Sequence, residues 1–359
     1  MTSARTFPHA APHTSPRMPV GLIGVGGIGR MHVERALRSA DVAITAIADP
    51  TESARAFAAS LNIPCYASHQ EMLDKVQVKA VIVATPNSLH VAQGLDCIAR
   101  GLVTLMEKPI ADSVAEARRL VDAAAAARVP LLTGHHRRHN PIIRRARQLV
   151  QDGALGRPVT ANVMATWLKP DSYYELAWRR EPGGGPVMIN LIHDIDLLLH
   201  LLGPITSVQA ITSSQVRGFA VEDTAAALLQ FANGALGTVT VSDAVAAPWN
   251  WDLGAGEAAH YPQQEIDSHY LAGTEGALTL PRLEMWRYRG ARGWHDPLSV
   301  ERTFVHNADP YSEQLRHLRA VVEGHEAPVC SGEDGLKTLQ ATRAVLEAAA
   351  SGMPVRISA

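Results

Sequence analysis

The stretch VGLIGVGGIG (residues 20–29) joins an apolar run to a Gly-x-Gly-x-x-Gly turn, and its turn residues are Gly24, Gly26, Gly27, Ile28 and Gly29. Glycines with this spacing let the backbone turn tightly and approach a pyrophosphate without a Cβ in the way. They also let the following helix pack closely on the sheet. The amides at the start of that helix then face the phosphates. We therefore predict a strand, turn and helix that bind a dinucleotide.

A carboxylate ends the next apolar run, about 20 residues after the glycine turn, where a dinucleotide-binding strand–helix–strand unit places an acidic residue. Asp49 ends the run AITAIAD and comes twenty residues after Gly29. A carboxylate there can accept hydrogen bonds from the adenosine ribose and would repel a 2′-phosphate. The spacing therefore favours NAD. NADP stays open as the cofactor, because Arg55 is close enough in sequence to assist a phosphate.

The chain outward from this motif alternates short buried strands with helices. The runs VGLIG, AITAIAD, AVIVAT, LVTLME and VPLLTG are separated by amphipathic segments rich in Ala, Arg and Glu. This alternation is typical of a parallel sheet covered by helices on both faces. Two of the helices have clear start signals, since Ser68 precedes Glu71 and Ser113 precedes Glu116 by three residues.

The pattern changes after about residue 140. A basic helix over residues 141–150 is followed by longer strands, by a hairpin signal at Asn233-Gly234 and by two helices over residues 311–324 and 335–351. We expect an α/β plus α+β protein, with an open, mostly antiparallel or mixed sheet in its second part. The predicted divisions are a disordered tail (residues 1–17), a Rossmann NAD(P)-binding domain (18–140), and a C-terminal substrate-binding and oligomerisation domain (141–359).

The composition excludes several classes of protein. Lys plus Arg number 33 against 35 for Asp plus Glu, so the net charge of −2 argues against a nucleic-acid-coating surface. Aromatic residues make up only 5%, too few for a base-stacking platform. Three scattered cysteines are typical of a reduced protein, and no apolar run is long enough for a membrane helix. Because the N-terminal tail also lacks the apolar core of a secretion signal, we expect a cytoplasmic protein.

Further motifs indicate one particular family of dinucleotide-binding proteins. Ala-Thr-Pro-Asn (residues 84–87) ends one strand and Glu-Lys-Pro (107–109) ends the next, while a triple glycine (183–185) precedes the segment NLIHDID (190–196). In these motifs the chain resembles the glucose-fructose oxidoreductase / inositol dehydrogenase / rhizopine-catabolism (Gfo/Idh/MocA) family of NAD(P)-dependent oxidoreductases. The resemblance extends over nearly everything from Met18 onward.

The resemblance implies roles for particular residues. Lys108 and His193 are the expected catalytic residues, with Asn190 in support. A lysine at a strand end would be partly desolvated, and a histidine near neutrality suits proton transfer. His136, Arg137 and Trp178 are expected to bind the substrate. The expected cofactor-binding residues are Gly24, Gly26, Gly27, Ile28, Gly29, Asp49, Thr85, Pro86, Asn87, His90, Glu107 and Lys108.

At one position the chain departs from the family pattern. Inositol dehydrogenase-like members have an aspartate four residues before the catalytic histidine, where this chain has Ile189. Asn190 could orient the imidazole of His193 but cannot stabilise its charged form as a carboxylate would. We expect no metal, because no acidic residue accompanies the histidines of GHHRRHN (residues 134–140).

The predicted function is hydride transfer between nicotinamide C4 and a secondary alcohol or ketone of a sugar, cyclitol or sugar acid. Two alternatives stay open. The substrate could be an aromatic cis-dihydrodiol or a similar small alcohol, or the chain could be a non-catalytic NAD-sensing regulator, because a fold does not fix a function. The family usually self-associates, so we expect a homodimer or homotetramer that binds neither nucleic acid nor membrane.

Overall fold

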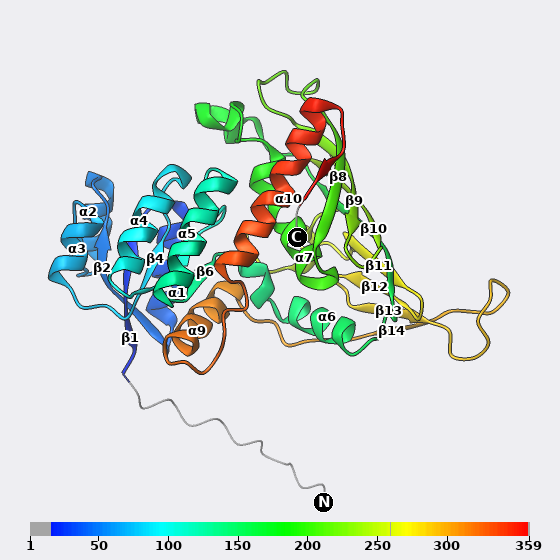
Figure 1. Cartoon of the computed structure of the whole chain (residues 1–359), viewed down its shortest axis with the longest axis horizontal. Helices are drawn as coiled ribbons and strands as arrows, with labels where there is room; N and C mark the ends of the chain where they lie inside the picture. Colours follow the sequence, from blue (N-terminus) through cyan, green and yellow to red (C-terminus); the bar gives the residue numbers. More distant parts are fainter. Residues whose placement is uncertain (1–15, 259, 358–359) are drawn as a thin grey trace, which may run out of the picture.

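The computed structural model describes residues 16–258 and 260–357, so nearly all of the predicted tail (residues 1–17) lies outside the described residues. Figure 1 shows two lobes, each built around one sheet: the blue and cyan lobe precedes the green and yellow one in sequence. Helices α9 (Pro310–Val322) and α10 (Gly332–Ser351) lie where the two lobes meet. The predicted combination of an α/β part and an α+β part is confirmed.

The first sheet is parallel, with strand order β3-β2-β1-β4-β5-β6. This is the doubly wound order whose switch point lies between β1 and β4, where ligands bind at the carboxyl edge. The buried apolar runs form its central strands, as predicted. The strands are β1 Met18–Ile23, β2 Val42–Ala48, β3 Cys65–Tyr66, β4 Ala80–Val83, β5 Val103–Met106 and β6 Leu131–Thr133.

Helices connect these strands and begin where the sequence predicts. The Ser68 side chain accepts a hydrogen bond from the Glu71 amide, and Ser113 accepts one from the Glu116 amide, so both helix starts are confirmed. Each such cap contributes about 1 kcal/mol to stability. The helices are α1 Gly27–Arg38, α2 Glu52–Ser60, α3 His69–Lys75, α4 Asn87–Ala99 and α5 Val114–Ala127.

The second sheet is mixed, and nine of its strands lie in the described residues in the order β14-β13-β12-β11-β7-β10-β9-β8-β15. Only the β7–β10 pair is parallel; the remaining recorded pairs are antiparallel. The predicted hairpin joins β9 to β10, with Gly234 at φ +87°. The strands are β7 Pro158–Thr166, β8 Ile205–Ser213, β9 Thr224–Phe231, β10 Leu236–Ser242, β11 His269–Gly273, β12 Ala277–Leu280, β13 Glu284–Arg287, β14 Ser299–Arg302 and β15 Val355–Arg356.

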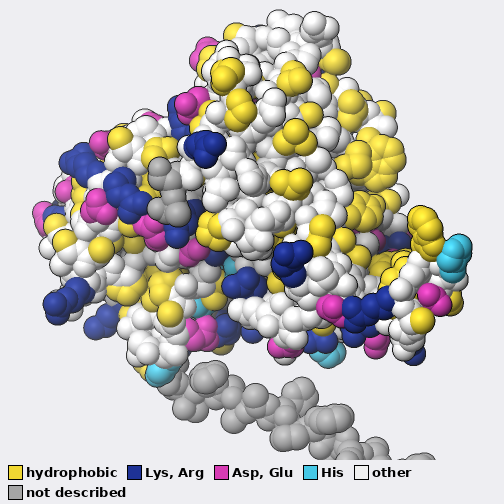
Figure 2. All heavy atoms as spheres, turned by 45° about the vertical axis from the view of Figure 1, so that its right-hand side comes forward, with side chains coloured by type: hydrophobic (Ala, Val, Ile, Leu, Met, Phe, Trp, Pro, Cys, Tyr) yellow, Lys and Arg dark blue, Asp and Glu magenta, His cyan; other side chains and the backbone are white. Residues whose placement is uncertain are grey.

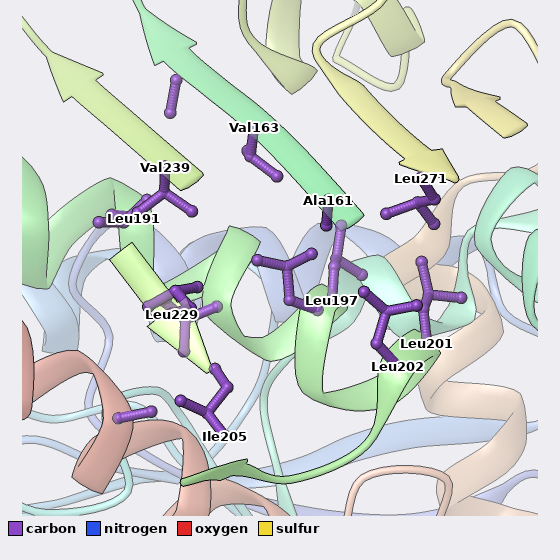
Figure 3. Packing of buried hydrophobic residues seen from close by; sticks show 14 of the residues in the cluster. Ala161, Val163, Leu191, Leu197, Leu201, Leu202, Ile205, Leu229, Val239 and Leu271 are labelled. Atoms are coloured by element: carbon purple, nitrogen blue, oxygen red, sulfur yellow. The ribbon is translucent and has the colours of Figure 1, made fainter. Parts of the chain in front are cut away.

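One face of the second sheet is packed against helices. Figure 3 shows Leu197, Leu201 and Leu202 of α7 beneath Val163 and Val239 of the central strands. Burying a leucine in this way contributes about 1.5–3 kcal/mol. The helical segments are η1 His136–His139, α6 Pro141–Gln151, η2 Asp171–Glu175, η3 Ala177–Arg180, the π-helical turn η4 Val187–Leu191, α7 Ile192–Leu202 and α8 Trp251–Ala255.

The last two helices return to the first sheet. Leu315 and Leu318 of α9 pack in the same core as Val20 of β1, and Leu336 and Leu339 of α10 pack in the core around β4. The C-terminal half of α10 packs instead in the core of the second sheet. The two sheets are therefore connected by a helix that belongs to both cores.

Within residues 16–258 and 260–357, none of the helices combines the length and the apolar character needed to cross a membrane.

Candidate active site

A cavity of about 650 Å³ opens at the carboxyl edge of the first sheet. It lies over the ends of β1, β2 and β4, the switch point of this topology. Of the residues expected to bind the cofactor, seven line it: Gly24, Gly26, Gly27, Ile28, Asp49, Thr85 and Pro86. The glycine turn after β1 and the Asp49 carboxylate after β2 therefore line one cavity.

The glycines of the turn have different structural tasks. Gly24 has φ +90°, which L side chains rarely adopt, and a Cβ on Gly29 would collide with the carbonyl group of Gly24. Around Gly26 and Gly27, by contrast, a Cβ would meet no atom within 4 Å. That open space lies at the N-terminus of α1, where backbone N–H groups and the helix dipole favour a pyrophosphate. The turn therefore fits the dinucleotide that the sequence predicts.

Asp49 is held rigidly at the rim of the cavity. Its carboxylate accepts hydrogen bonds from the Val25 amide (2.9 Å) and from the amide and hydroxyl of Thr51 (2.9 and 2.7 Å). Burial opposes ionisation, but these hydrogen bonds and the charge of Arg30 lower the pKa of Asp49 below its usual value. Arg55 is bound to Glu52 and to the Pro50 carbonyl instead. An ionised carboxylate is thus available to ribose hydroxyls.

The loops after β4 and β5 are joined by a buried histidine. The His90 ring nitrogens lie 2.9 Å from the carbonyl oxygens of Thr85 and Pro109, and its side chain is fully buried. His90 therefore positions the loop that borders the cavity. Asn87 begins α4 just beyond that loop. Glu107 lies deeper, 2.7 Å from His32 Nε2 of α1.

Lys108 follows β5 directly and reaches into the second lobe. Its Nζ donates a hydrogen bond to the Ile189 carbonyl (3.0 Å) in the π-helical turn η4. Burial, with Arg137 and Lys169 adding to it and Glu107 opposing it, lowers the pKa of Lys108 to about 8. The described residues place no carboxylate in an ion pair with this ammonium group. A lysine in these surroundings still has N–H groups to offer to a substrate oxygen.

The π-helical turn also presents Asn190. Its Oδ1 accepts a hydrogen bond from Lys169 Nζ (2.8 Å), which lies 3.4 Å from the buried carboxylate of Asp243. Lys169 follows the end of β7 and is 7% exposed. Sequence reasoning missed Lys169, and the only available signal was its position after a strand in TWLKP. Single π-helical turns are frequent at functional sites.

His193 lies at the start of α7, close to the histidines that follow β6. Its ring centroid is 5.2 Å from that of His136 and 6.0 Å from that of His135. Burial and the nearby charges of Lys108 and Arg137 hold the pKa of His193 well below its usual value. Among the described residues, its buried Nδ1 has no hydrogen-bond partner. These surroundings therefore favour the neutral form of the His193 imidazole.

The residues expected to bind substrate do not share one environment. Arg137 is 5% exposed, and its guanidinium is bound to Asp194 (3.0 Å) and Asp252 (3.1 Å). His136 is also buried and lies beside His193. Trp178, in η3, is 49% exposed. The structure thus brings His136 and Arg137 together with His193 and leaves Trp178 on the surface.

Two further side chains complete the surroundings of His136, and sequence reasoning missed both. Tyr311 of α9 stacks on the His136 ring, with centroids 4.2 Å apart and 15° between the planes. Glu257, after α8, lies 3.3 Å from His136 Nε2. Both come from segments more than a hundred residues away, so no local pattern could reveal them.

A dinucleotide cavity with a lysine of lowered pKa just beyond it has the arrangement that a nicotinamide-dependent oxidoreductase requires. Residues 18–135 match the oxidoreductase family with an NAD-binding Rossmann fold, and residues 143–279 match the GFO/IDH/MocA C-terminal domain. The chain belongs to the Gfo/Idh/MocA family of oxidoreductases.

Characterised relatives cover almost the whole chain. It is 30% identical over 342 residues to 1,5-anhydro-D-fructose reductase of Ensifer adhaerens, covering 94% of this chain and 98% of that protein. It is 25% identical over 338 residues to myo-inositol 2-dehydrogenase of Thermotoga maritima, covering 90% and 93%. Both relatives are named for redox reactions of polyhydroxylated rings.

Solved structures share the fold. The WlbA dehydrogenase of Bordetella pertussis, in complex with NADH and UDP-GlcNAcA, has a TM-score of 0.78 at 24% identity, covering 96% of this chain and 99% of that one. An oxidoreductase of Agrobacterium radiobacter, in complex with NAD+, L-tartaric acid and magnesium, has a TM-score of 0.77 at 21% identity, covering 95% and 98%. At this identity the likeness establishes the two-sheet architecture.

Proposed function

We propose that the chain is an NAD-dependent dehydrogenase that oxidises a secondary alcohol of a sugar, cyclitol or sugar acid, or reduces the matching ketone. The relatives that span nearly the full chain act, by their names, on an anhydro-sugar and on inositol, which supports this substrate class. The observation that carries the proposal is Lys108, a partly buried ammonium group at the end of β5 with no carboxylate ion-paired to it in the described residues.

We assign cofactor binding and catalysis to different residues of this chain. Gly26 and Gly27, at the start of α1, hold the pyrophosphate and Asp49 holds the adenosine ribose. The nicotinamide ring, when bound, accepts the hydride. Lys108, charged below a pH of about 8, donates a hydrogen bond to the substrate oxygen and stabilises the negative charge that develops there. His193 lies within the same cluster and takes part in proton transfer.

The remaining candidates orient the substrate or the site. Asn190, held by Lys169, presents an amide at the π-helical turn beside the Ile189 carbonyl that binds Lys108. Arg137 is bound by two carboxylates, so we assign it to positioning rather than to gripping the substrate. Trp178 is free to cover one side of a bound sugar, because it is half exposed in a short helical segment.

A screen tests the function. The purified chain is assayed with NAD and with NADP against polyols, cyclitols, sugar acids and aromatic cis-dihydrodiols, following the absorbance of the reduced nicotinamide. Turnover of a sugar, cyclitol or sugar acid with NAD is the expected result. Turnover of dihydrodiols alone would change the substrate class. Tight NAD binding without turnover of any compound would favour a sensing protein and contradict the proposal.

Replacement of Lys108 tests the assigned chemistry. K108A should lower kcat about 10²- to 10³-fold, the usual effect of removing a group that stabilises a developing oxyanion. NAD affinity, measured by calorimetry, should change far less because Lys108 does not line the dinucleotide cavity. K79A is the matched control: Lys79 is an exposed lysine just before β4, at the opposite edge of the sheet. Nearly full activity in K108A would refute the assignment.

We also propose that the protein is a cytoplasmic homodimer or homotetramer. The second sheet has one face packed by helices, while its other face exposes Ile211, Leu228 and Leu236. Ile211 and Leu228 line a hollow of about 250 Å³ on this face. Hydrophobic side chains gather on this side of the molecule in Figure 2. Such patches are typical of protein interfaces. Three free cysteines are compatible with a reducing compartment.

A further inference from the structure

A second carboxylate–histidine contact lies beside His193. His136 Nε2 is 3.3 Å from Glu257 Oε1, and the other oxygen of Glu257 accepts a hydrogen bond from Asn140 Nδ2 (2.8 Å). Both side chains are buried, with 11% of His136 and 6% of Glu257 exposed. Burial opposes ionisation of Glu257, but His136 and Arg137 lower the pKa of Glu257 to about 2. A permanently charged carboxylate therefore faces the imidazole of His136.

The charges around this contact leave a negative excess. The Arg137 guanidinium is 3.0 Å from Asp194, 3.1 Å from Asp252 and 4.0 Å from Glu257, so three carboxylates share one permanent cation. Asp194 also has the buried imidazole of His269 beside it, at 3.3 Å. Buried charge must be balanced to be tolerated. A proton on His136 would supply part of the missing positive charge, and it would sit directly against Glu257.

The ring of Tyr311, which stacks on His136, also favours the protonated form of the His136 imidazole. Burial, together with the charges of Glu107 and Glu257, raises the pKa of Tyr311 well above its usual value, so Tyr311 stays a neutral phenol. A cation against the face of a neutral aromatic ring is stabilised. The titratable groups around His136 are Glu257, Tyr311, His193, His135, His139, Arg137 and Glu107.

His193 has the opposite surroundings. Burial and the positive charges of Lys108, Arg137, His136 and His135 all lower the pKa of His193, and its buried Nδ1 has no partner among the described residues. A proton that reaches His193 is therefore destabilised there, while the edge-on ring of His136 lies 5.2 Å away, centroid to centroid.

We propose that His136 and Glu257 form the carboxylate–histidine pair that stores the proton released when the alcohol is oxidised. In this step the C–H bond breaks and its electron pair leaves with the hydrogen as hydride for the nicotinamide ring. The O–H bond also breaks, the C=O bond forms, and the proton passes by way of His193 to His136. The inference rests on the proposed dehydrogenase function. Glu257 acts through His136 and is a positioning residue.

A titration that needs no substrate tests the pair directly. Histidine ring carbons of the full chain are labelled with ¹³C and followed by NMR against pH, with H136N and H193N to assign the two signals. His136 should take up its proton at a higher pH than His193. E257Q should lower the His136 midpoint by about 1–3 pH units, the usual effect of an adjacent opposite charge. The reverse order of protonation in the wild-type protein would overturn the proposal.

Kinetics then test the same pair in turnover. E257Q should lower kcat for alcohol oxidation about 10- to 100-fold with little change in KM, since general base catalysis contributes up to about 10⁴-fold. It should also move the acid limb of the kcat profile to lower pH, whereas a purely structural defect would leave that limb in place. E257D, which keeps the carboxylate, should restore the limb. An unmoved limb in E257Q would contradict the proposal.

The matched control is E323Q. Glu323 and His325 form a carboxylate–histidine contact of 3.4 Å at the C-terminal end of α9, with side chains that are 38% and 71% exposed. E323Q should leave both the His136 midpoint and the kcat profile unchanged. Absence of turnover in the wild-type chain would count against the dehydrogenase function alone, because the NMR titration gives its answer without activity. If E257Q does not fold, the protonation order in the wild-type protein still decides.

Discussion

The lowered pKa of Lys108 predicts a measurable pH dependence. Desolvation lowers the pKa of Lys108 from its ordinary 10.5 to about 8, so the ammonium form, which we propose stabilises a developing oxyanion, is present below that pH and is lost above it. We expect kcat for alcohol oxidation to fall as the pH rises through about 8. In K108R the positive charge persists beyond pH 12, so this fall should disappear, although the bulkier group lowers the maximum rate.

Steady-state kinetics between pH 6 and 10 would check this expectation, with wild type and K108R compared under one buffer system. K79R, at the opposite edge of the sheet, is the control and should keep the wild-type profile. A wild-type kcat that stays level across pH 8–10, or a K108R profile with the same fall, would show that Lys108 does not provide the charge.

Site residues that lie next to a strand end were predictable, and those brought in by the fold were not. The glycine turn and Asp49 meet in one cavity because parallel strands end at the same edge, which the spacing alone indicates. Glu257 and Tyr311 come from segments more than a hundred residues from His136 and contact it only in the folded chain. Nothing in their local sequence distinguishes them from surface residues. Lys169 does follow a strand, but its contact with Asn190 joins segments 21 residues apart and has no sequence pattern.

Within the phosphate-binding turn, two glycines should respond oppositely to the same substitution. A Cβ on Gly29 collides with the Gly24 carbonyl, so G29A should destabilise the fold by about 1–3 kcal/mol, as overpacking usually does. A Cβ on Gly27 meets no atom, so G27A should keep its unfolding midpoint. Its methyl group projects into the cavity, where we propose that the pyrophosphate binds, and should weaken NAD binding roughly tenfold, about 1.4 kcal/mol.

Urea unfolding and calorimetric NAD titration of both variants would separate these effects. G27A serves as the control for stability and G29A as the control for the binding measurement, once its folded fraction is known. Equal destabilisation by the two substitutions would contradict the close-packing explanation for Gly29.

The element that escaped prediction is the π-helical turn η4. The segment VMINL reads as the beginning of the helix that contains His193, and a single wide turn has no pattern of its own in sequence. Its effect is to turn the Ile189 carbonyl toward Lys108 and the Asn190 amide toward Lys169. The two lysines therefore bind adjacent residues of one turn, an arrangement that only the structure reveals.

For the whole molecule, the exposed face of the second sheet predicts self-association. Ile211 and Leu228 are 78% and 56% exposed on neighbouring strands, so the double substitution I211E/L228E should place charges in the interface and yield single chains. Light scattering coupled to size exclusion would measure the mass. L37E, at an exposed leucine of α1, is the control. A wild-type protein that is already monomeric would refute the proposal.

The arrangement of the lobes was predictable in outline only. Two sheets of the expected kinds are present, and the second begins at Pro158, after the change of pattern near residue 140. The sequence could not show that α9 and α10, which follow all but one of the second sheet's strands, pack on the first sheet. Their apolar positions indicate a buried face and do not say which core buries it.

Helix α10 is packed at its two ends into two different hydrophobic cores. Leu336 and Leu339 anchor one end in the first core, and Ala344 and Val345 anchor the other end in the second. Neither core can lose its packing without releasing one end of this helix. NAD binding raises the free energy of unfolding of the first lobe. Because α10 packs in both cores, we expect it to raise the free energy of unfolding of the second lobe as well. Occupancy of the dinucleotide cavity should thus protect amide hydrogens of both lobes against exchange with solvent.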